Sequence, residues 1–152
     1  MGRALLRVHI ARCGNNREMI SAKDECLMLL EKAFSMEPRL CYEGIGVDDG
    51  TGNRAFRGRK FIESQDRLES EFEQLIACEE WLVPQHRKRA INKKFSSYKL
   101  KHIVEHTKNK HVSNGALCAM AIGLEFKYEV DGPNIYINIS NDLYDYDGTP
   151  TA

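Results

Sequence analysis

The side chains best suited to bind a charged ligand lie between Pro84 and His111. This basic stretch contains nine Lys or Arg residues, a single acid, Glu105, and four of the five histidines of the chain. The whole protein has a formal net charge of zero, so acidic segments elsewhere must offset this local charge. Lys and Arg that neutralise phosphates release counterions, which gives affinity for nucleic acid regardless of its sequence. We therefore predict binding to nucleic acid, or to a protein complex that handles it, through Arg87, Lys88, Arg89, Lys93, Lys94, Lys99 and Lys101.

The same charge has another explanation within the fold. Residues Lys60 to Val83 carry a net charge of −5, and the C-terminal tail is also acidic, so these segments could neutralise the basic stretch. Phe95 and Tyr98 could stack on bases, but aromatic residues at these positions also suit a helix that faces a core.

His102 and His106 are four residues apart in a predicted helix, and this spacing can hold a metal ion. The order HIVEH, with Glu105 directly before the second histidine, matches the HxxEH pattern rather than HExxH. No third ligand is evident, and the surrounding cations would repel a metal. We predict no metal, no cofactor and no catalysis, with a metal-dependent enzyme built on this segment as the alternative.

Two further motifs are weaker. The start of a predicted helix at Ser113, Asn114 and Gly115 offers free backbone N–H groups to an anion, which adds Asn114 to the candidate binding residues. The segment GIGVDDGTGN at residues 44–53 lacks the Lys-Ser/Thr of a P-loop and the alternating acids of a calcium loop, so it predicts a hairpin turn.

Apolar periodicity predicts the elements that position these residues. In the first half we expect a strand at 4–11, a turn at 12–17, a helix capped by Ser21 that stops before Pro38, a strand at 40–47 broken by glycines, and one long helix from Lys60 to Leu82.

In the second half, after the basic linker that begins at Pro84, two helices and a hairpin are expected. They are a helix capped by Ser96 or Ser97 that runs to Thr107, a connection at 109–112, an apolar helix capped by Ser113 that ends with Gly123 in the left-handed conformation, and a hairpin from Phe126 to Ile139 that turns at DGPN.

This order predicts an α+β fold with an N-terminal part, 1–83, and a C-terminal part, 84–152, in one compact unit. A helix-turn-helix followed by a hairpin is similar to a winged helix, in which the second helix normally enters the major groove. Here the second helix is the apolar one. We therefore expect the first helix and the preceding linker to contact phosphates, with low sequence specificity.

Size and composition predict a cytoplasmic protein, monomeric or homodimeric. The chain has 152 residues, of which 42% are hydrophobic and 29% are charged. It has no apolar run long enough to span a membrane, and its N-terminus does not have the pattern of a secretory signal. Its five cysteines are widely spaced without a CxxC pair, so we expect buried, reduced thiols.

Three segments, INKKFSSYKLKHIVEH, HVSNGALCAMAIGLEF and GPNIYINIS, resemble small, largely uncharacterised proteins of bacteriophages and other mobile elements. The resemblance covers residues 91–140 and rests on Ser97, Tyr98, Leu100, Lys101, His102, Glu105 and the run from Ser113 to Ala116. It implies a bacterial or phage setting and an accessory role, and it transfers no catalytic residue. Such accessory proteins include inhibitors of host defence, among them anti-CRISPR proteins. A second hypothesis is therefore an inhibitor that acts through a protein interface, which separate acidic and basic faces would suit.

Overall fold

The structure is a computed structural model that describes residues 16–46 and 58–144, with side chains from 22–46 and 60–144. The predicted strand at 4–11 and most of the glycine-rich 44–53 segment lie outside these residues. In chain order the elements are α2 (Asn16–Met36), β1 (Leu40–Cys41), β2 (Gly44–Ile45), α3 (Gly58–Ser70), α4 (Phe72–Leu82), α5 (Ser97–Lys108), α6 (Asn114–Gly123), β3 (Tyr128–Asp131) and β4 (Asn134–Ile137).

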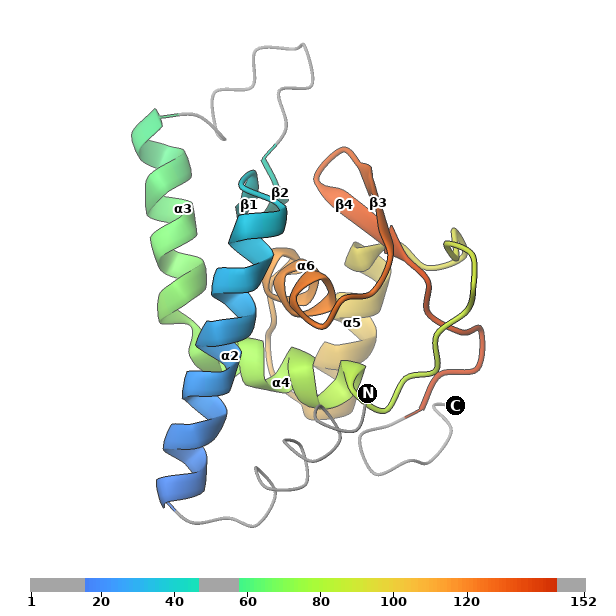
Figure 1. The fold of residues 1–152 in the computed structure, drawn as a ribbon, viewed down its shortest axis with the longest axis horizontal. Coiled ribbons are helices and arrows are strands. Elements are labelled where there is room, and N and C mark those ends of the chain that lie inside the picture. The colour runs from blue at the N-terminus through green and yellow to red at the C-terminus, as the bar shows by residue number, and fades with distance from the viewer. Residues whose placement is uncertain (1–15, 47–57, 145–152) are drawn as a thin grey trace.

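Helix α6 lies at the centre of the fold, enclosed as its sequence predicts (Figure 1). All 10 of its residues are buried, and it packs against α2, α4, α5 and the two hairpins. The Ser113 hydroxyl accepts a hydrogen bond from the Ala116 N–H at 3.0 Å and so caps the helix. A helix that is apolar on every side must be covered on every side. The other elements are therefore arranged around α6.

Gly123 does not end α6 in the left-handed conformation, so that prediction is wrong. Leu124 caps the helix with φ −78°, and the left-handed residue is Glu125, with φ 66°. A Cβ atom on Gly123 would lie 2.5 Å from the carbonyl oxygen of Leu29. The glycine therefore permits α2 and α6 to pack with their backbones almost in contact.

The long helix predicted from Lys60 to Leu82 is in fact two helices that run in different directions (Figure 1). The break is at Glu71, where φ is −89° and ψ is 52°. Helix α3 packs against β1, where Ser64 accepts a hydrogen bond from the Tyr42 N–H at 3.0 Å. Helix α4 packs against α2, α5 and α6. The sequence has no Pro or Gly at the break. We attribute the break to tertiary packing, because the two halves pack against different elements.

The N-terminal half differs from its prediction in two further places. Helix α2 already includes Asn16, so the predicted turn does not extend to residue 17 and Ser21 is not a cap; the helix does end before Pro38. The chain reverses between Cys41 and Gly44, where β1 and β2 pair as a short antiparallel hairpin. The predicted strand at 40–47 is therefore two strands.

The C-terminal elements are confirmed. Ser96 caps α5 by accepting from the Lys99 N–H at 3.2 Å, and β3 pairs antiparallel with β4, with Tyr128 opposite Ile137. Gly132 has φ 59° in the turn. Helices combined with two small antiparallel sheets confirm the α+β class.

The described cysteines, at 26, 41, 78 and 118, are buried and unpaired, as expected. Burial raises the pKa of the Cys118 thiol to about 12. No helix within 16–46 or 58–144 has the length and apolar character needed to cross a membrane.

Candidate functional site

The first part of the basic stretch is an ordered loop beside β4, which the sequence alone describes only as a linker. Backbone hydrogen bonds join the Lys88 N–H to the Asn138 carbonyl at 2.6 Å and the Asn92 N–H to the Ile137 carbonyl at 2.9 Å. The Ser140 N–H donates to the carbonyl of His86 at 2.8 Å. We call residues 85–95 the basic loop. Its backbone is hydrogen-bonded to residues 137–140, much as an edge strand pairs with its neighbour in a sheet.

Two buried amides, Asn92 and Asn138, complete this attachment. The Asn138 side chain donates to the Lys88 carbonyl at 2.8 Å and accepts from the Lys127 N–H at 2.8 Å. The Asn92 amide donates to the Ile139 carbonyl at 2.8 Å. Sequence analysis did not identify either asparagine. The only local signal is that Asn138 lies within the alternating run of Ile135, Ile137 and Ile139.

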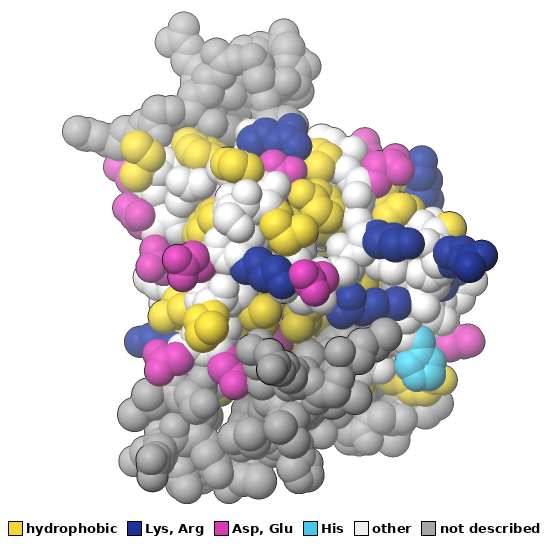
Figure 2. Space-filling model, in the orientation of Figure 1, with side chains coloured by type: hydrophobic (Ala, Val, Ile, Leu, Met, Phe, Trp, Pro, Cys, Tyr) yellow, Lys and Arg dark blue, Asp and Glu magenta, His cyan; other side chains and the backbone are white. Residues whose placement is uncertain are grey.

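The exposed part of the predicted site forms a basic face. Lys88, Arg89, Lys94 and Lys99 are exposed and pair with no acid among the described residues. Lys93 is also exposed and lies 3.1 Å from Glu129. An ion pair at the surface contributes little to the free energy of unfolding. Figure 2 shows Lys and Arg side chains gathered on the right, over the basic loop and β3. We call these five residues and Lys127 the basic face.

Lys127 is a member of the basic face that sequence analysis did not identify. Its Nζ donates to the Arg89 carbonyl at 3.2 Å, although the two residues are 38 positions apart. The pairing of the basic loop with the hairpin brings them together, and no local pattern in the sequence indicates this contact.

Three of the predicted binding residues make their main contacts inside the fold. The Arg87 guanidinium donates to the Leu124 carbonyl at 2.7 Å and lies 3.9 Å above the Phe126 ring. Lys101 is buried and lies 3.0 Å from Glu105. Asn114 is buried, and its amide nitrogen donates within the protein rather than to an anion. The geometry separates these residues from the basic face.

Acidic residues of α4 neutralise the end of the basic stretch, so the explanation by internal neutralisation applies in part. Lys108 lies 2.7 Å from Glu80, and Lys110 lies 3.7 Å from Glu73. These pairs join the end of α5 and the connection that follows it to α4. The acids of α4 therefore offset the charge at this end, and none of them pairs with a residue of the basic face.

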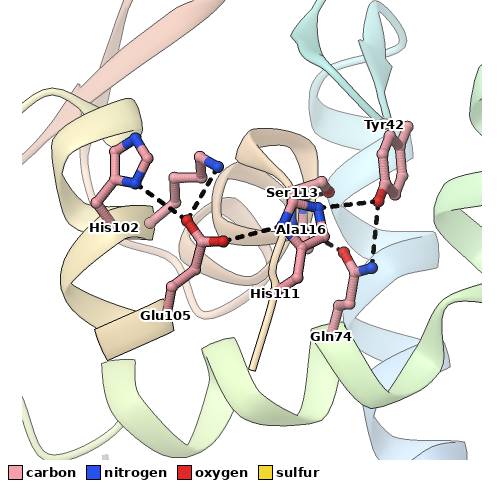
Figure 3. Close-up of polar contacts among 8 residues, drawn as sticks. Tyr42, Gln74, His102, Glu105, His111, Ser113 and Ala116 are labelled. Atoms are coloured by element: carbon pink, nitrogen blue, oxygen red, sulfur yellow. Dashed lines mark hydrogen bonds and ion pairs between the residues drawn. The ribbon is translucent and has the colours of Figure 1, made fainter. Parts of the chain in front are cut away.

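Two of the four histidines of the basic stretch, His102 and His111, lie against one carboxylate, that of Glu105 (Figure 3). Glu105 accepts a hydrogen bond from Lys101 Nζ at 3.0 Å, and its carboxylate oxygens lie 2.9 Å from His111 Nδ1 and 3.1 Å from His102 Nδ1. Within the described residues, no group of three or more His, Cys, Asp or Glu side chains could hold a metal ion. The structure brings His102 and His111 together around Glu105, and no contact of His106 with this carboxylate occurs among the described residues.

A chain of polar contacts extends from this cluster to the centre of the fold (Figure 3). His111 Nε2 lies 3.5 Å from the Tyr42 hydroxyl, which accepts from the Gln74 amide at 3.2 Å. Gln74 in turn accepts from the Ser113 N–H at 2.9 Å. These contacts position the start of α6 relative to α4 and β1, which is a structural task.

Replacing Glu105 by glutamine should destabilise the protein by about 1–2 kcal/mol at pH 7, because the ammonium group of Lys101 loses its charged partner while it stays buried. Burial tends to raise the pKa of Glu105, but Lys101 and His111 outweigh this effect and lower it. The carboxylate therefore stabilises the fold above the unfolded pKa of about 4.3. The contribution is lost as the pH falls through the lower, folded pKa.

Urea unfolding of the parent and Glu105→Gln as a function of pH measures this contribution. The difference in stability should be full near neutrality and shrink in the acid range. Glu129→Gln, which removes an exposed pair with Lys93, is the control and should change stability by less than about 0.5 kcal/mol. A Glu105→Gln difference that does not depend on pH would contradict the assignment.

Comparisons of the chain with protein-family models, curated proteins and solved structures gave no significant match.

Proposed function

We propose that this chain is a non-enzymatic accessory protein of a bacteriophage or mobile element that binds nucleic acid through the basic face. One observation carries the proposal: four exposed cations, Lys88, Arg89, Lys94 and Lys99, have no acidic partner within the described residues, whereas neighbouring cations are neutralised. Unpaired cations gathered on one surface attract phosphates and release counterions.

The ordered backbone of the basic loop supports this function. Because the loop is hydrogen-bonded to β4, its cations are already held near one another, and binding need not order the backbone. Tyr98 is 53% exposed next to Lys99, with its ring edge-on to the His102 ring at 4.6 Å between centroids, and its exposed part would contact an unpaired base.

The contacts we propose are to phosphates rather than to base edges. Helix α6, the second helix of the helix-turn-helix order, is entirely buried and presents no surface to a major groove. Binding through the basic loop and the first turn of α5 would give little sequence specificity and a strong dependence on salt.

The charge reversal Lys88→Glu with Arg89→Glu should lower affinity for short oligonucleotides at least about tenfold at about 50 mM salt, because two phosphate contacts become repulsive. Fluorescence anisotropy with single-stranded and duplex oligonucleotides at about 50 and about 200 mM salt measures it. The slope of log affinity against log salt should become shallower by about two.

The control for this test is Lys23→Glu with Lys60→Glu, which changes the net charge equally at exposed positions on α2 and α3. It should keep most of the affinity, and both variants should melt like the parent. Absence of binding at low salt, or an equal loss in the control, would contradict the proposal.

An inhibitor of host defence that acts through a protein interface is the second candidate. Acidic side chains gather over α2 and α3, on the opposite side from the basic face (Figure 2). Salt-insensitive capture of a host protein by the Lys88, Arg89 reversal variant would favour this candidate over nucleic-acid binding.

A further inference from the structure

A groove runs between α2 and α3, which lie side by side in Figure 1. It consists of two adjoining cavities of about 510 and about 410 Å³, which share Phe34 and Glu69. Leu27, Met28 and Phe34 line it from α2, and Phe61 lines it from α3. Figure 2 shows apolar side chains between acidic ones over these helices.

The groove is apolar because α2 has more apolar residues than α6 can cover. Cys26, Leu29 and Ala33 are buried in the core. On another side of α2, Met28 is 61% exposed, and Phe34 is only partly buried. A helix with a second apolar stripe needs a second partner. An exposed methionine is also suited to adapt to an incoming apolar side chain.

The rim of the groove is acidic. Asp24, Glu31, Asp66 and Glu69 line it, and the described lining contains no Lys, Arg or His. None of these four carboxylates forms an ion pair within the described residues. Four like charges around an apolar floor favour a ligand that is both apolar and positively charged.

We propose that the α2–α3 groove binds a basic amphipathic helix of a partner protein. From Asp24 to Phe34 the groove follows α2 for about 15 Å, which accommodates nearly three turns of a bound helix. Apolar side chains at helical spacing would insert beside Met28 and Phe34, with flanking Lys and Arg against the carboxylates.

A second copy of this chain fits the groove less well. The unpaired cations of the basic face lie mainly on a loop, without an apolar helical stripe beside them. Docking that face into the groove would also be head to tail, which leads to rings or open filaments rather than to a two-fold symmetric dimer. The groove lies away from the basic face, so the inference does not depend on nucleic-acid binding.

Methionine methyl groups provide the test. We would label the full chain with [¹³C-methyl]methionine and titrate it with a peptide of Leu and Lys in helical amphipathic order, and with a matched peptide that has Glu in place of Lys. The Met28 resonance, assigned with Met28→Leu, should shift with the Lys peptide alone. Met120, buried in α6, should not shift.

Charge reversal locates the peptide. Glu31→Lys with Glu69→Lys should weaken binding of the Lys peptide about tenfold, as expected for the loss of two surface ion pairs. Glu129→Lys with Asp142→Lys, at exposed acids outside the groove, is the control and should leave the affinity nearly unchanged. Circular dichroism checks that both variants are folded.

Four results would overturn the proposal. The first is a Met28 resonance that does not shift with the Lys peptide, and the second is an equal shift with the Glu peptide. The third is an equal loss of affinity in the control variant, and the fourth is a groove that is occupied by a segment of this chain or by a second copy of it. Self-association that disappears in Glu31→Lys with Glu69→Lys would make a second copy the occupant. A Met28 shift without peptide on reversal of Arg3 and Arg7 would make it the N-terminal segment, whose first 15 residues hold three Arg and no acid.

Discussion

Replacing Gly115 by alanine should destabilise the protein by more than about 4 kcal/mol, a large fraction of the roughly 5–15 kcal/mol that stabilises a native domain. A Cβ atom at this position would lie 1.9 Å from the carbonyl oxygen of Cys41 and 2.5 Å from that of Tyr42. Both atoms belong to backbone, so no side-chain rotation relieves the overlap. The Gly115 N–H also donates to the Tyr42 carbonyl at 2.9 Å, and this hydrogen bond would be lost if α6 and the β1–β2 hairpin moved apart.

The sign of this effect is informative, because alanine in place of glycine inside a helix normally stabilises it by up to about 1 kcal/mol. The β1–β2 hairpin cannot easily move away from Gly115, because β1 packs on α3 and the Ile45 N–H donates to the Pro133 carbonyl at 2.9 Å. Urea and thermal unfolding, followed by circular dichroism, measure the loss.

Gly132→Ala is the matched control. Unlike Gly115, which is helical, Gly132 has a positive φ of 59°, and nothing lies within 4 Å of its Cβ position. It should therefore show only the conformational penalty, about 1–2 kcal/mol. A Gly115→Ala protein as stable as Gly132→Ala would contradict the close packing between α6 and β1.

Replacing Asn114 by aspartate should destabilise the protein by about 3–5 kcal/mol at pH 7. The Asn114 amide nitrogen donates toward the carbonyls of Glu43 and Pro133, each at 3.1 Å, and toward Asn134 Oδ1 at 3.0 Å. A carboxylate oxygen in this place would face three acceptors. It would have no donor to offset its burial, and the connection between the two hairpins would be lost.

Asn114→Ala separates the charge from the lost hydrogen bonds, because it leaves the acceptors unpaired without adding a charge, at a cost of about 1–3 kcal/mol. The site would raise the folded pKa of the new aspartate above the unfolded value of about 3.9. Its extra destabilisation should therefore be small below that value, grow as the pH rises from the unfolded toward the folded pKa, and stay constant above the folded pKa. Unfolding of both variants across pH measures this, and equal stability at every pH would contradict the assigned contacts.

The prediction for Asn114 also shows how far a local motif can be interpreted. The Ser-Asn-Gly start of α6 does begin a capped helix, as its sequence indicates. The same sequence is compatible with an exposed anion site. What excludes this in the structure is burial by two hairpins, and their position relative to the start of α6 has no local signal.

Local chemistry was enough to predict most of the C-terminal half. Ser96 and Ser113 cap their helices, the DGPN turn joins β3 to β4, and α6 is enclosed because it has no polar side. Each of these features depends on residues a few positions apart. Capping, turn formation and binary patterning act over that range, so the sequence carries them directly.

Features that depend on distant contacts could not be predicted in this way. The break at Glu71 follows from two helices that pack on different partners, and Gly115 and Gly123 are needed because backbones far away in the chain approach them. Helical periodicity continues across Glu71, and a glycine has no side chain from which its neighbour could be inferred.

The sequence by itself determined that positive charge is concentrated between Pro84 and His111. Tertiary structure alone decided which of these charges is available to a ligand. Lys108 pairs with Glu80, 28 positions earlier, whereas Lys94 and Lys99 pair with no acid among the described residues. Composition sums the charges of a segment, but whether a cation is neutralised depends on distances of a few ångströms, and those distances are set by how α4 and α5 pack.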